Sequence, residues 1–561
     1  MKTKTLTPMR RFWKLLTPDY KEIKSVYLYA IFNGLISLTL PLGIQAIVNL
    51  IQGGQITTSW IVLVCIVVLG LAVTGILQIF QLRITESLQR RIFTRAAFEF
   101  TYRLPKIKAQ TWFTKDAPEL MNRFFDVVSV QKGLSKMLIE FTAAALQVIF
   151  GLILLSFYHP FFILFSLILL LFIYAIFKLT AAKGLKSSIQ ESTEKYKVAH
   201  WLEEMARSAA SFSSISSSKL PLQKLDKRVD AYLTSRQSHF KVLVQQYSLL
   251  VVFKVIIAAG LLAIGGILVM EEIMNIGQFI AAEIIILLVM NSVEKLISSL
   301  ETLYDVLTAL EKVGQVTDLP IEEEKGMSLK TQCDDCGMSV VGKELTVYLG
   351  TPKPLLSKFS LNLTPDSTTL ITGPSGSGKT TLLKTLSGRY PLDSGTLTFQ
   401  DFTIGNLSTA GLREVIGTVL PEDSLFEGTL LENLTMGREG IDFADIVKWT
   451  QVMGLEDFVK QLPEGYDTEI VTYGRRWPRT VVLKWLLIRA MASRPKLLLL
   501  DEVFAGWRWE ETQKVLTAIS EPSNGWTMVL VSNEKELIPL VDQVLPMDEN
   551  PTFISQPQNP S

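Results

Sequence analysis

The chain has 561 residues, of which 48% are hydrophobic, so it is too long for one domain and more apolar than a typical soluble protein. Its 55 Lys and Arg residues balance 54 Asp and Glu residues, which leaves a formal net charge of +1. This balance argues against nucleic-acid binding through bulk charge, so we expect no nucleic-acid partner.

The apolar residues concentrate before residue 300, in runs close to the roughly 20 residues that a membrane-spanning helix needs. Basic residues such as Lys14 precede the first run, whereas the loop at 52–59 carries no charge. Segments rich in Lys and Arg follow the second and fourth runs, which places them in the cytoplasm. We therefore expect a multi-pass inner-membrane protein, surrounded by lipid, with both termini cytoplasmic. The six predicted spans are 27–51, 60–82, 141–158, 160–181, 246–270 and 276–299.

The texture of the chain changes after the last span. Residues 312–330 form an acidic linker marked by proline, and short strand-like runs then alternate with helical stretches. The predicted organisation is a transmembrane domain at 1–311 with cytoplasmic helix extensions, the linker, an α/β domain at 331–550 and a tail at 551–561.

A glycine-rich segment fits the phosphate-binding pattern G-x-x-x-x-G-K-[ST]. Its small residues let backbone N–H groups close around a phosphate, while the lysine reaches the outer phosphate oxygens and the threonine hydroxyl can ligate Mg²⁺. The segment follows a strand-like run and precedes a helical one, which is the context that the motif requires. Its residues are Gly373, Pro374, Ser375, Gly376, Ser377, Gly378, Lys379, Thr380 and Thr381.

Two carboxylates end a buried strand-like run at 497–502. Asp501 is predicted to hold Mg²⁺ directly or through water, and Glu502 to activate the attacking water as a general base. The alternative is a core strand with solvated acids at its end. The phosphate loop favours the catalytic interpretation, with ATP and Mg²⁺ as ligands.

With these motifs, the chain resembles a half-transporter of the ABC exporter family: six spans followed by one P-loop ATPase domain of α/β type. Arg103-Leu-Pro, Pro118–Asp126 and the segment starting at Trp201 resemble the family's intracellular coupling loops. The first two spans are similar to those of type I secretion exporters. The resemblance implies a second half-transporter as partner, and it assigns Tyr348 to stacking on adenine, for which the alternative is an ordinary strand tyrosine.

Other elements depart from the family pattern. Pro421 stands where the family has a glutamine, and the neighbouring Glu422 either reaches Mg²⁺ through water or is a solvated loop acid. Asn533 replaces the switch histidine, and no histidine follows His239 anywhere in the chain. Residues 503–508 lack the aspartate that communicates between sites. The family signature, Leu-Ser-Gly-Gly-Gln, is replaced by Trp477, Pro478, Arg479, Thr480 and Val481.

The signature binds the γ-phosphate of ATP held by the opposite subunit, through a serine hydroxyl and glycine N–H groups. Pro478 removes one donor, and Arg479 adds bulk. Arg475, Arg476 and Arg479 either contact that phosphate by charge or form a solvated basic turn. The segment therefore predicts a degenerate catalytic motif.

Three hypotheses follow. The first is an exporter subunit that binds ATP, is catalytically degenerate and works with a more complete partner half. The second is an ATP-regulated membrane protein that does not pump, against which the retained Glu502 argues. The third is a homodimeric exporter with atypical motifs. The sequence does not name a cargo, although the similarity to secretion exporters favours a polypeptide or amphiphile handled with a periplasmic adaptor and an outer-membrane channel.

A few further residues carry chemistry of their own. Within the spans, Lys254 and Glu283 are the costliest side chains to bury, and both are candidates for a transport cavity. Lys254 is also close enough to a cytoplasmic end to snorkel, the interpretation that we favour. Cys333 and Cys336 have zinc-like spacing without a second pair, which favours reduced thiols without metal.

Overall fold

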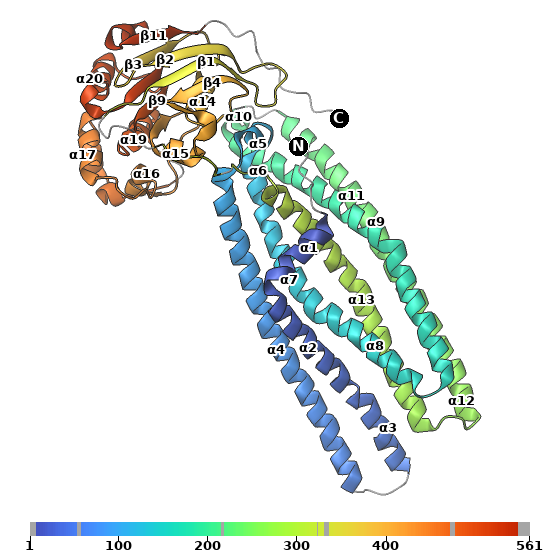
Figure 1. Ribbon diagram of the computed structural model, residues 1–561. Coiled ribbons are helices and arrows are strands. Elements are labelled where there is room, and N and C mark those ends of the chain that lie inside the picture. Colours follow the sequence, from blue (N-terminus) through green and yellow to red (C-terminus); the bar gives the residue numbers. More distant parts are fainter. Residues whose placement is uncertain are drawn as a thin grey trace. The chain divides into compact units, whose positions relative to one another are not determined.

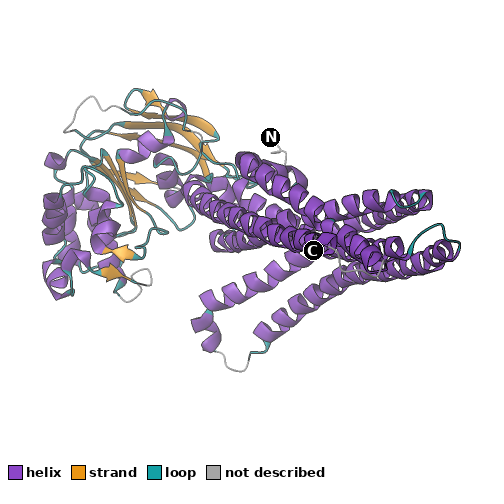
Figure 2. Ribbon diagram, turned by 90° about the horizontal axis from the view of Figure 1, so that it is seen from below, coloured by secondary structure: helices purple, strands orange, loops and turns teal. Residues whose placement is uncertain are grey.

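A computed structural model describes residues 7–52, 58–214, 218–322, 324–329, 336–471 and 477–547. Its contacts divide the chain into a helical unit of Met1–Lys106 with Lys115–Leu319, and an α/β unit of Ile107–Thr114 with Pro320–Ser561. The predicted fold class is therefore confirmed. Figure 2 shows helices alone in the first unit and both helices and strands in the second, within the described part of the chain.

Long helices dominate the first unit (Figure 1). Two of them continue through short π-type segments, Met137–Phe141 after α7 and Leu261–Gly265 after α11. The helices are α1 (Pro8–Leu16), α2 (Tyr20–Ser37), α3 (Thr39–Gln52), α4 (Thr58–Arg103), α6 (Ala117–Met121), α7 (Asp126–Lys136), α8 (Thr142–Ser156), α9 (Pro160–Arg207), α10 (Ala209–Ser213), α11 (Leu220–Gly260), α12 (Gly266–Met270) and α13 (Ile276–Thr317).

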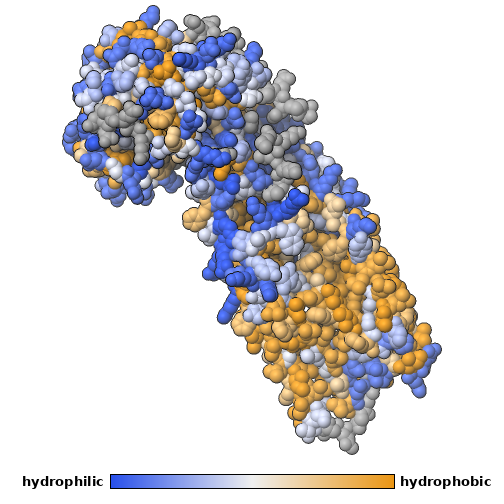
Figure 3. Space-filling view, viewed as in Figure 1, coloured by the Kyte–Doolittle hydropathy of each residue, from blue (hydrophilic) through white to orange (hydrophobic). Residues whose placement is uncertain are grey.

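Six helical segments among the described residues are long and apolar enough to cross a membrane, which confirms the predicted number. Figure 3 shows apolar side chains gathered over the part of this unit where α2, α3, α4 and α8 lie, and hydrophilic ones around α1. The short loop at 157–159 separates two spans: α8 ends at Ser156 and α9 begins at Pro160. The last helix, α13, continues to Thr317, beyond the predicted domain end at 311.

Lys254 has an ion-pair partner that the sequence did not predict. Its ammonium group forms an ion pair with Glu294, which lies on α13 inside the last predicted span. Pairing with a carboxylate lowers the cost of holding the charge within the membrane. Glu283, on the same helix, is partly exposed.

The second unit carries three sheets among the described residues. The short helix α5 (Ala109–Thr114) belongs to it because Ile107 pairs with Ile321 in a β-bridge and the Lys108 N–H donates to the Pro320 carbonyl at 3.0 Å. The strands are β1 (Val340–Val347), β2 (Leu356–Leu363), β3 (Thr368–Thr372), β4 (Ser394–Phe399), β5 (Phe402–Thr403), β6 (Ile416–Val419), β7 (Gly428–Thr429), β8 (Glu469–Ile470), β9 (Leu497–Asp501), β10 (Thr527–Val531) and β11 (Gln543–Pro546). The other helices are α14 (Lys379–Leu386), α15 (Thr409–Glu414), α16 (Leu430–Thr435), α17 (Phe443–Val452), α18 (Glu456–Gln461), α19 (Arg479–Met491) and α20 (Trp509–Ile519).

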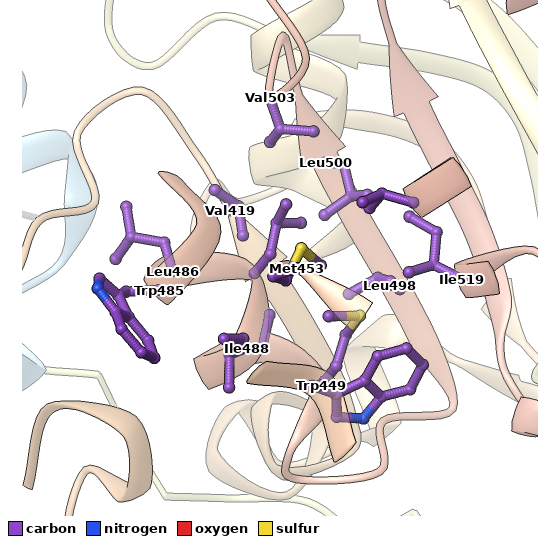
Figure 4. Close-up of a cluster of buried hydrophobic side chains, with 14 of the residues drawn as sticks. Val419, Trp449, Met453, Trp485, Leu486, Ile488, Leu498, Leu500, Val503 and Ile519 are labelled. Atoms are coloured by element: carbon purple, nitrogen blue, oxygen red, sulfur yellow. The ribbon is translucent and has the colours of Figure 1, made fainter. Parts of the chain in front are cut away.

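A parallel sheet in the order β11-β3-β10-β9-β6 forms the centre of this unit, beside an antiparallel sheet in the order β2-β1-β4-β5. Because successive side chains on a strand point to opposite faces, β9 supplies both hydrophobic clusters of the core. Leu497 and Leu499 join the cluster that contains β1, β2 and α14. Leu498 and Leu500 join the cluster of α17 and α19, where Figure 4 places them near Trp449 and Met453. Both faces of the sheet are thus buried, so the carboxyl ends of its strands remain as the edge where a ligand can bind.

Candidate nucleotide-binding site

The predicted phosphate loop joins the end of β3 to the start of α14. Gly373, Gly376 and Gly378 all have positive φ angles, of 147°, 87° and 101°. A Cβ atom on Gly373 would lie 2.4 Å from the Met547 carbonyl oxygen, and one on Gly378 would lie 2.7 Å from that of Leu355. Both conformation and space therefore require glycine here, which explains the composition of the motif.

Lys379 is the first residue of α14 and is 7% exposed. Its ammonium group donates to the carbonyl oxygens of Gly373 at 2.6 Å and Pro374 at 2.8 Å. Burial lowers the pKa of this lysine, and the carboxylates of Glu502 and Asp501 oppose the shift. The cation is thus held across its own loop. The Ser377 hydroxyl in the same loop is buried and has no hydrogen-bond partner among the described residues, as expected of a group that awaits a ligand.

Asp501 ends β9 and is 6% exposed. Burial raises its pKa, a hydrogen bond with the Thr380 side chain opposes the rise, and the neighbouring Glu502 charge adds to it. Its Oδ2 atom is buried without a partner in the described part of the chain. A buried, unpaired carboxylate oxygen beside a threonine hydroxyl fits the oxygen ligands that Mg²⁺ prefers.

Glu502 directly follows this strand in a left-handed conformation, with φ of 48°. Its backbone N–H donates to the Val531 carbonyl at the end of β10, at 3.0 Å. Positive φ is uncommon outside glycine and costs about 1–3 kcal/mol, so neighbouring contacts must hold the turn. The turn leaves the Glu502 side chain exposed beside the buried Asp501.

Asn533 lies two residues beyond β10. Its side-chain oxygen accepts a hydrogen bond from the Gly373 N–H at 3.1 Å. The residue at the predicted switch position therefore contacts the first glycine of the phosphate loop. An uncharged amide at this place can orient the loop or a phosphate, but it brings no positive charge.

Tyr348 lies one residue beyond β1 and is 39% exposed. Its backbone N–H donates to the Asp393 carboxylate at 2.6 Å, which fixes the turn. That turn leads to Leu355, whose carbonyl lies beside Gly378. The exposed tyrosine thus lies on a turn that ends beside the phosphate loop.

Pro421 and Glu422 follow β6, and the Glu422 side chain is 45% exposed but forms two ion pairs. Its carboxylate pairs with Lys384 at 3.1 Å and Arg389 at 3.3 Å. Arg389 also reaches Asp423 at 3.1 Å. Both cations lie in or just after α14, so they tie this segment to the helix of the phosphate loop. Sequence reasoning missed them, because the only signal was two basic residues after the motif.

The segment at the signature position opens α19. Pro478 precedes the helix, and Arg479 is its exposed first residue. The Trp477 ring packs edge-on against Phe458 of α18, with ring centroids 5.2 Å apart and planes at 88°. Thr480 and Val481 are partly buried in the first turn. Trp477 thus belongs to the hydrophobic core of its own unit, while Arg475 and Arg476 lie outside the described residues.

The segment at 503–508 is tied to α19 as well. Phe504 and Trp507 pack edge-on with centroids 5.3 Å apart, and the Lys484 ammonium lies 5.2 Å from the centre of the Trp507 ring. Lys484 also forms a mostly buried ion pair with Glu511 of α20. These contacts join α19 to α20, and no motif in the sequence pointed to them. Of the cysteine pair, Cys333 lies outside the described residues.

Two family models match the chain. The model described as ABC transporter transmembrane region matches residues 26–293, and the model described as ABC transporter matches residues 356–505. The chain is 25% identical over 395 residues to the transport/processing ATP-binding protein ComA of Streptococcus pneumoniae, covering 69% of this chain and 54% of ComA. It is 23% identical over 293 residues to the alpha-hemolysin translocation ATP-binding protein HlyB of Escherichia coli O157:H7, covering 52% and 41%.

These matches span about half the length of the curated relatives, for example 48% of the uncharacterised ABC transporter ATP-binding protein YknV of Bacillus subtilis. Among solved structures, a bacterial Atm1-family ABC exporter with ATP bound aligns with a TM-score of 0.79 and 16% identity, covering 94% of this chain and 93% of that chain. At this identity the likeness shows the fold alone. It agrees with six spans followed by one α/β domain.

Proposed function

The chain belongs to the ABC transporter family, and we propose that it is an exporter half that binds ATP through its own phosphate loop but depends on a more complete partner half for efficient hydrolysis. The observation that carries the proposal is the contrast between an intact loop around Lys379 and a replaced signature at the start of α19. ABC exporters work as dimers of half-transporters, so the phosphate loop and the signature segment of each half both matter for function.

ATP binding is supported by the left-handed glycines, the lysine held across the loop and the unpaired Ser377 hydroxyl. Phosphate oxygens would take over the Lys379 ammonium from the two loop carbonyls. Tyr348 would stack on the adenine. Thr380 and Asp501 would hold Mg²⁺, which neutralises phosphate charge when it is bound. Each group named here belongs to one chain, so binding needs no partner.

This chain retains only part of the set of groups that ATP hydrolysis needs. Glu502 is placed to take the proton of an attacking water, because it is exposed next to Asp501 at the strand end. Asn533 contacts the loop but carries no positive charge to stabilise the developing transition state. Pro421, without a side-chain amide, replaces the glutamine of the family pattern. The general base Glu502 thus remains, while the groups that assist it in the family pattern are replaced by Asn533 and Pro421.

A partner half would make the dimer asymmetric. One site would join the loop, Asp501 and Glu502 of this chain to an intact signature from the partner. The other would join the partner's loop to residues 477–481, where Pro478 lacks an N–H donor and Arg479 adds bulk. We infer that the first site hydrolyses ATP and that the second holds ATP for long periods without hydrolysing it. Closure of the nucleotide domains would then be passed to the spans through the intracellular loops.

The orientation follows from the nucleotide. Because ATP is cytoplasmic, we propose an inner-membrane location with both termini inside, in agreement with the basic N-terminal stretch. Similarity to ComA and HlyB, a transport/processing protein and a translocation protein by name, favours a polypeptide or amphiphilic cargo. A periplasmic adaptor and outer-membrane channel are consistent with that class.

The decisive test compares the purified chain alone with the chain in complex with an ABC exporter half whose motifs are complete. We expect ATP binding in both samples, slow hydrolysis by the chain alone and faster hydrolysis by the complex. In the complex, Glu502→Gln should lower the rate that depends on this chain by about 10²–10⁴-fold, the usual contribution of a general base. Glu510→Gln, at an exposed position in the first turn of α20, is the matched control and should leave the rate unchanged.

Rapid turnover by the chain alone that is lost in Glu502→Gln would overturn the partner requirement and support a homodimeric exporter. Loss of assembly, rather than of transport, in a Lys379→Ala complex would support a regulatory role for ATP without pumping.

A further inference from the structure

A cavity of about 430 Å³ lies within the helical unit, between α7, α9, α11 and α13. Its lining residues fall outside the six predicted spans, at the end of α13 that leads to the α/β unit. Neither the phosphate loop nor the altered motifs are part of it. A cavity on this side of the membrane is open to a molecule that arrives from the cytoplasm.

Positively and negatively charged side chains line different sides of the cavity. Lys132 and Lys136 on α7 and Lys195 on α9 are exposed side chains of the lining, and none forms an ion pair with a described residue. Asp305 on α13 is exposed in the lining and likewise has no ion-pair partner in the described part of the chain. Glu301, one turn earlier, is also exposed. Positive charge thus gathers on α7 and α9, and negative charge on α13.

Other charged groups of the lining are satisfied. Arg236 pairs with Glu191 at 3.1 Å, and the Tyr196 hydroxyl donates to Asp126 at 2.6 Å. These pairs hold their own charges in place, so they leave the three lysines and Asp305 as the groups available to a ligand.

The buried part of the lining carries hydroxyl and imidazole groups. His239 is 2% exposed and lies 2.9 Å from the Ser187 hydroxyl through Nδ1. Ser188 and Thr308 hydroxyls are 2.8 Å apart. Ser192 is 8% exposed, lines the cavity and has no hydrogen bond to a described residue. A wall of hydroxyl and imidazole groups offers hydrogen bonds to a polar ligand.

A polar face continues from this cavity along α13 into the last span. Asn291, Glu294, Ser298, Glu301 and Asp305 follow one another at intervals of three or four residues, so they share one side of the helix. All five are exposed or partly exposed, and Glu294 forms the ion pair with Lys254. Such residues are costly against lipid, so this side of α13 faces water or protein.

We propose that the cavity is the cytoplasmic entry site for cargo and that it binds a zwitterionic group, such as the charged ends of a peptide. Lys132 and Lys136 hold the anionic end, and Asp305 holds the cationic end. The polar face of α13 then offers the next contacts, with the exposed side chains of Asn291 and Ser298. The entry role rests on the proposed export function, whereas binding of a zwitterion does not.

The experiment measures binding of triglycine to the full chain in lipid nanodiscs without nucleotide, beside succinate and putrescine as purely anionic and purely cationic probes. The variants are the double change Lys132→Gln with Lys136→Gln, and Asp305→Asn. We expect each to weaken triglycine binding by about 10- to 100-fold, as for loss of a charged hydrogen bond. Lys227→Gln and Asp230→Asn, at exposed positions of α11 outside the lining, are the matched controls and should leave binding unchanged.

Absence of triglycine binding, or equal binding by all variants, would overturn the proposal. So would succinate binding as tight as that of triglycine and insensitive to Asp305→Asn, because it would identify an anion site only. These outcomes are separate from the proposed function, since no ATP is present. If the chain hydrolysed ATP unaided while triglycine binding followed the variants, the partner requirement would fail and the cavity would stand.

Discussion

The N-termini of α14 and α19, two helices of the α/β unit, differ in how their free N–H groups are used. Every helix N-terminus offers free N–H groups and the positive end of the helix dipole, and so it attracts phosphate. The start of α14 follows three glycines with positive φ angles, and its cap residue is Gly378. The start of α19 follows Pro478, and a tryptophan just before it packs into the core.

The difference between these two N-termini indicates which part of a composite ATP site this chain has kept: the phosphate loop rather than the signature. At α14, the buried Ser377 hydroxyl lacks a partner among the described residues, as a binding site requires. At α19, Trp477 and Lys484 contribute contacts to Phe458, Trp507 and Glu511. The N-terminus of α14 is therefore suited to bind a ligand, whereas the segment at the N-terminus of α19 packs against its own unit.

Replacing Trp477 should reveal that packing role most clearly. Trp477→Ala removes a partly buried ring and its edge-on contact with Phe458, so we expect a loss of about 2–3 kcal/mol in the stability of the α/β unit. Thermal unfolding of the full chain in detergent should show its transition lowered by about 4–8 °C. The control is Trp509→Ala, which alters a 41% exposed ring and should shift the transition by less than about 2 °C. Equal shifts would mean that Trp477 is a surface residue in solution.

Nucleotide binding should depend on the α14 end alone. Lys379→Ala removes the cation that is held across the loop, and we expect the affinity of the isolated chain for ATP to fall by about 10- to 100-fold. Arg479→Ala removes an exposed cation at the start of α19 and should change the affinity by less than about twofold. Titration with a fluorescent ATP analogue measures both. A comparable loss in the two variants would show that α19 binds nucleotide even within one chain.

The sequence was sufficient wherever a pattern is local. The phosphate loop and the acids that end β9 lie where their spacing placed them, because each motif depends on neighbours along the chain. The six spans are confirmed because their signal is the length and apolar composition of single segments.

Contacts between distant segments were not predictable in the same way. Glu294 pairs with Lys254 across two helices, and Glu422 meets Lys384 and Arg389 from another element. The aromatic contact of Trp477 needs α18, which no motif marks. A charge or a ring in a sequence has many possible partners, and only tertiary packing selects one. The ion pairs of Lys254 and Glu422 were not predicted for this reason.

The loop itself can be tested through its backbone. Gly378→Ala places a Cβ atom 2.7 Å from the Leu355 carbonyl at a φ of 101°, so we expect a loss of about 1–3 kcal/mol in stability together with weaker ATP binding. Gly437→Ala is the matched change: its φ is 68°, and nothing lies within 4 Å of the added atom. It should cost about 1 kcal/mol and leave ATP binding intact. Denaturation and ATP titration of both variants would separate steric collision from the cost of positive φ. Equal effects on ATP binding would contradict the close packing at Gly378.

The smallest expected effect concerns proton uptake at the same loop. Burial lowers the pKa of Lys379, so part of its charge is lost at a lower pH than for a free lysine. Phosphate binds the protonated form, and the ATP affinity should therefore be full at neutral pH and decline as the pH rises through the lowered pKa. We expect this fall in affinity across the alkaline range, measured by titration with the ATP analogue. Lys379→Arg keeps its charge throughout this range and should bind with a flatter pH profile, although more weakly. A parallel decline in both proteins would place the titrating group elsewhere than at Lys379, and the burial of this lysine would then not govern how the loop holds phosphate.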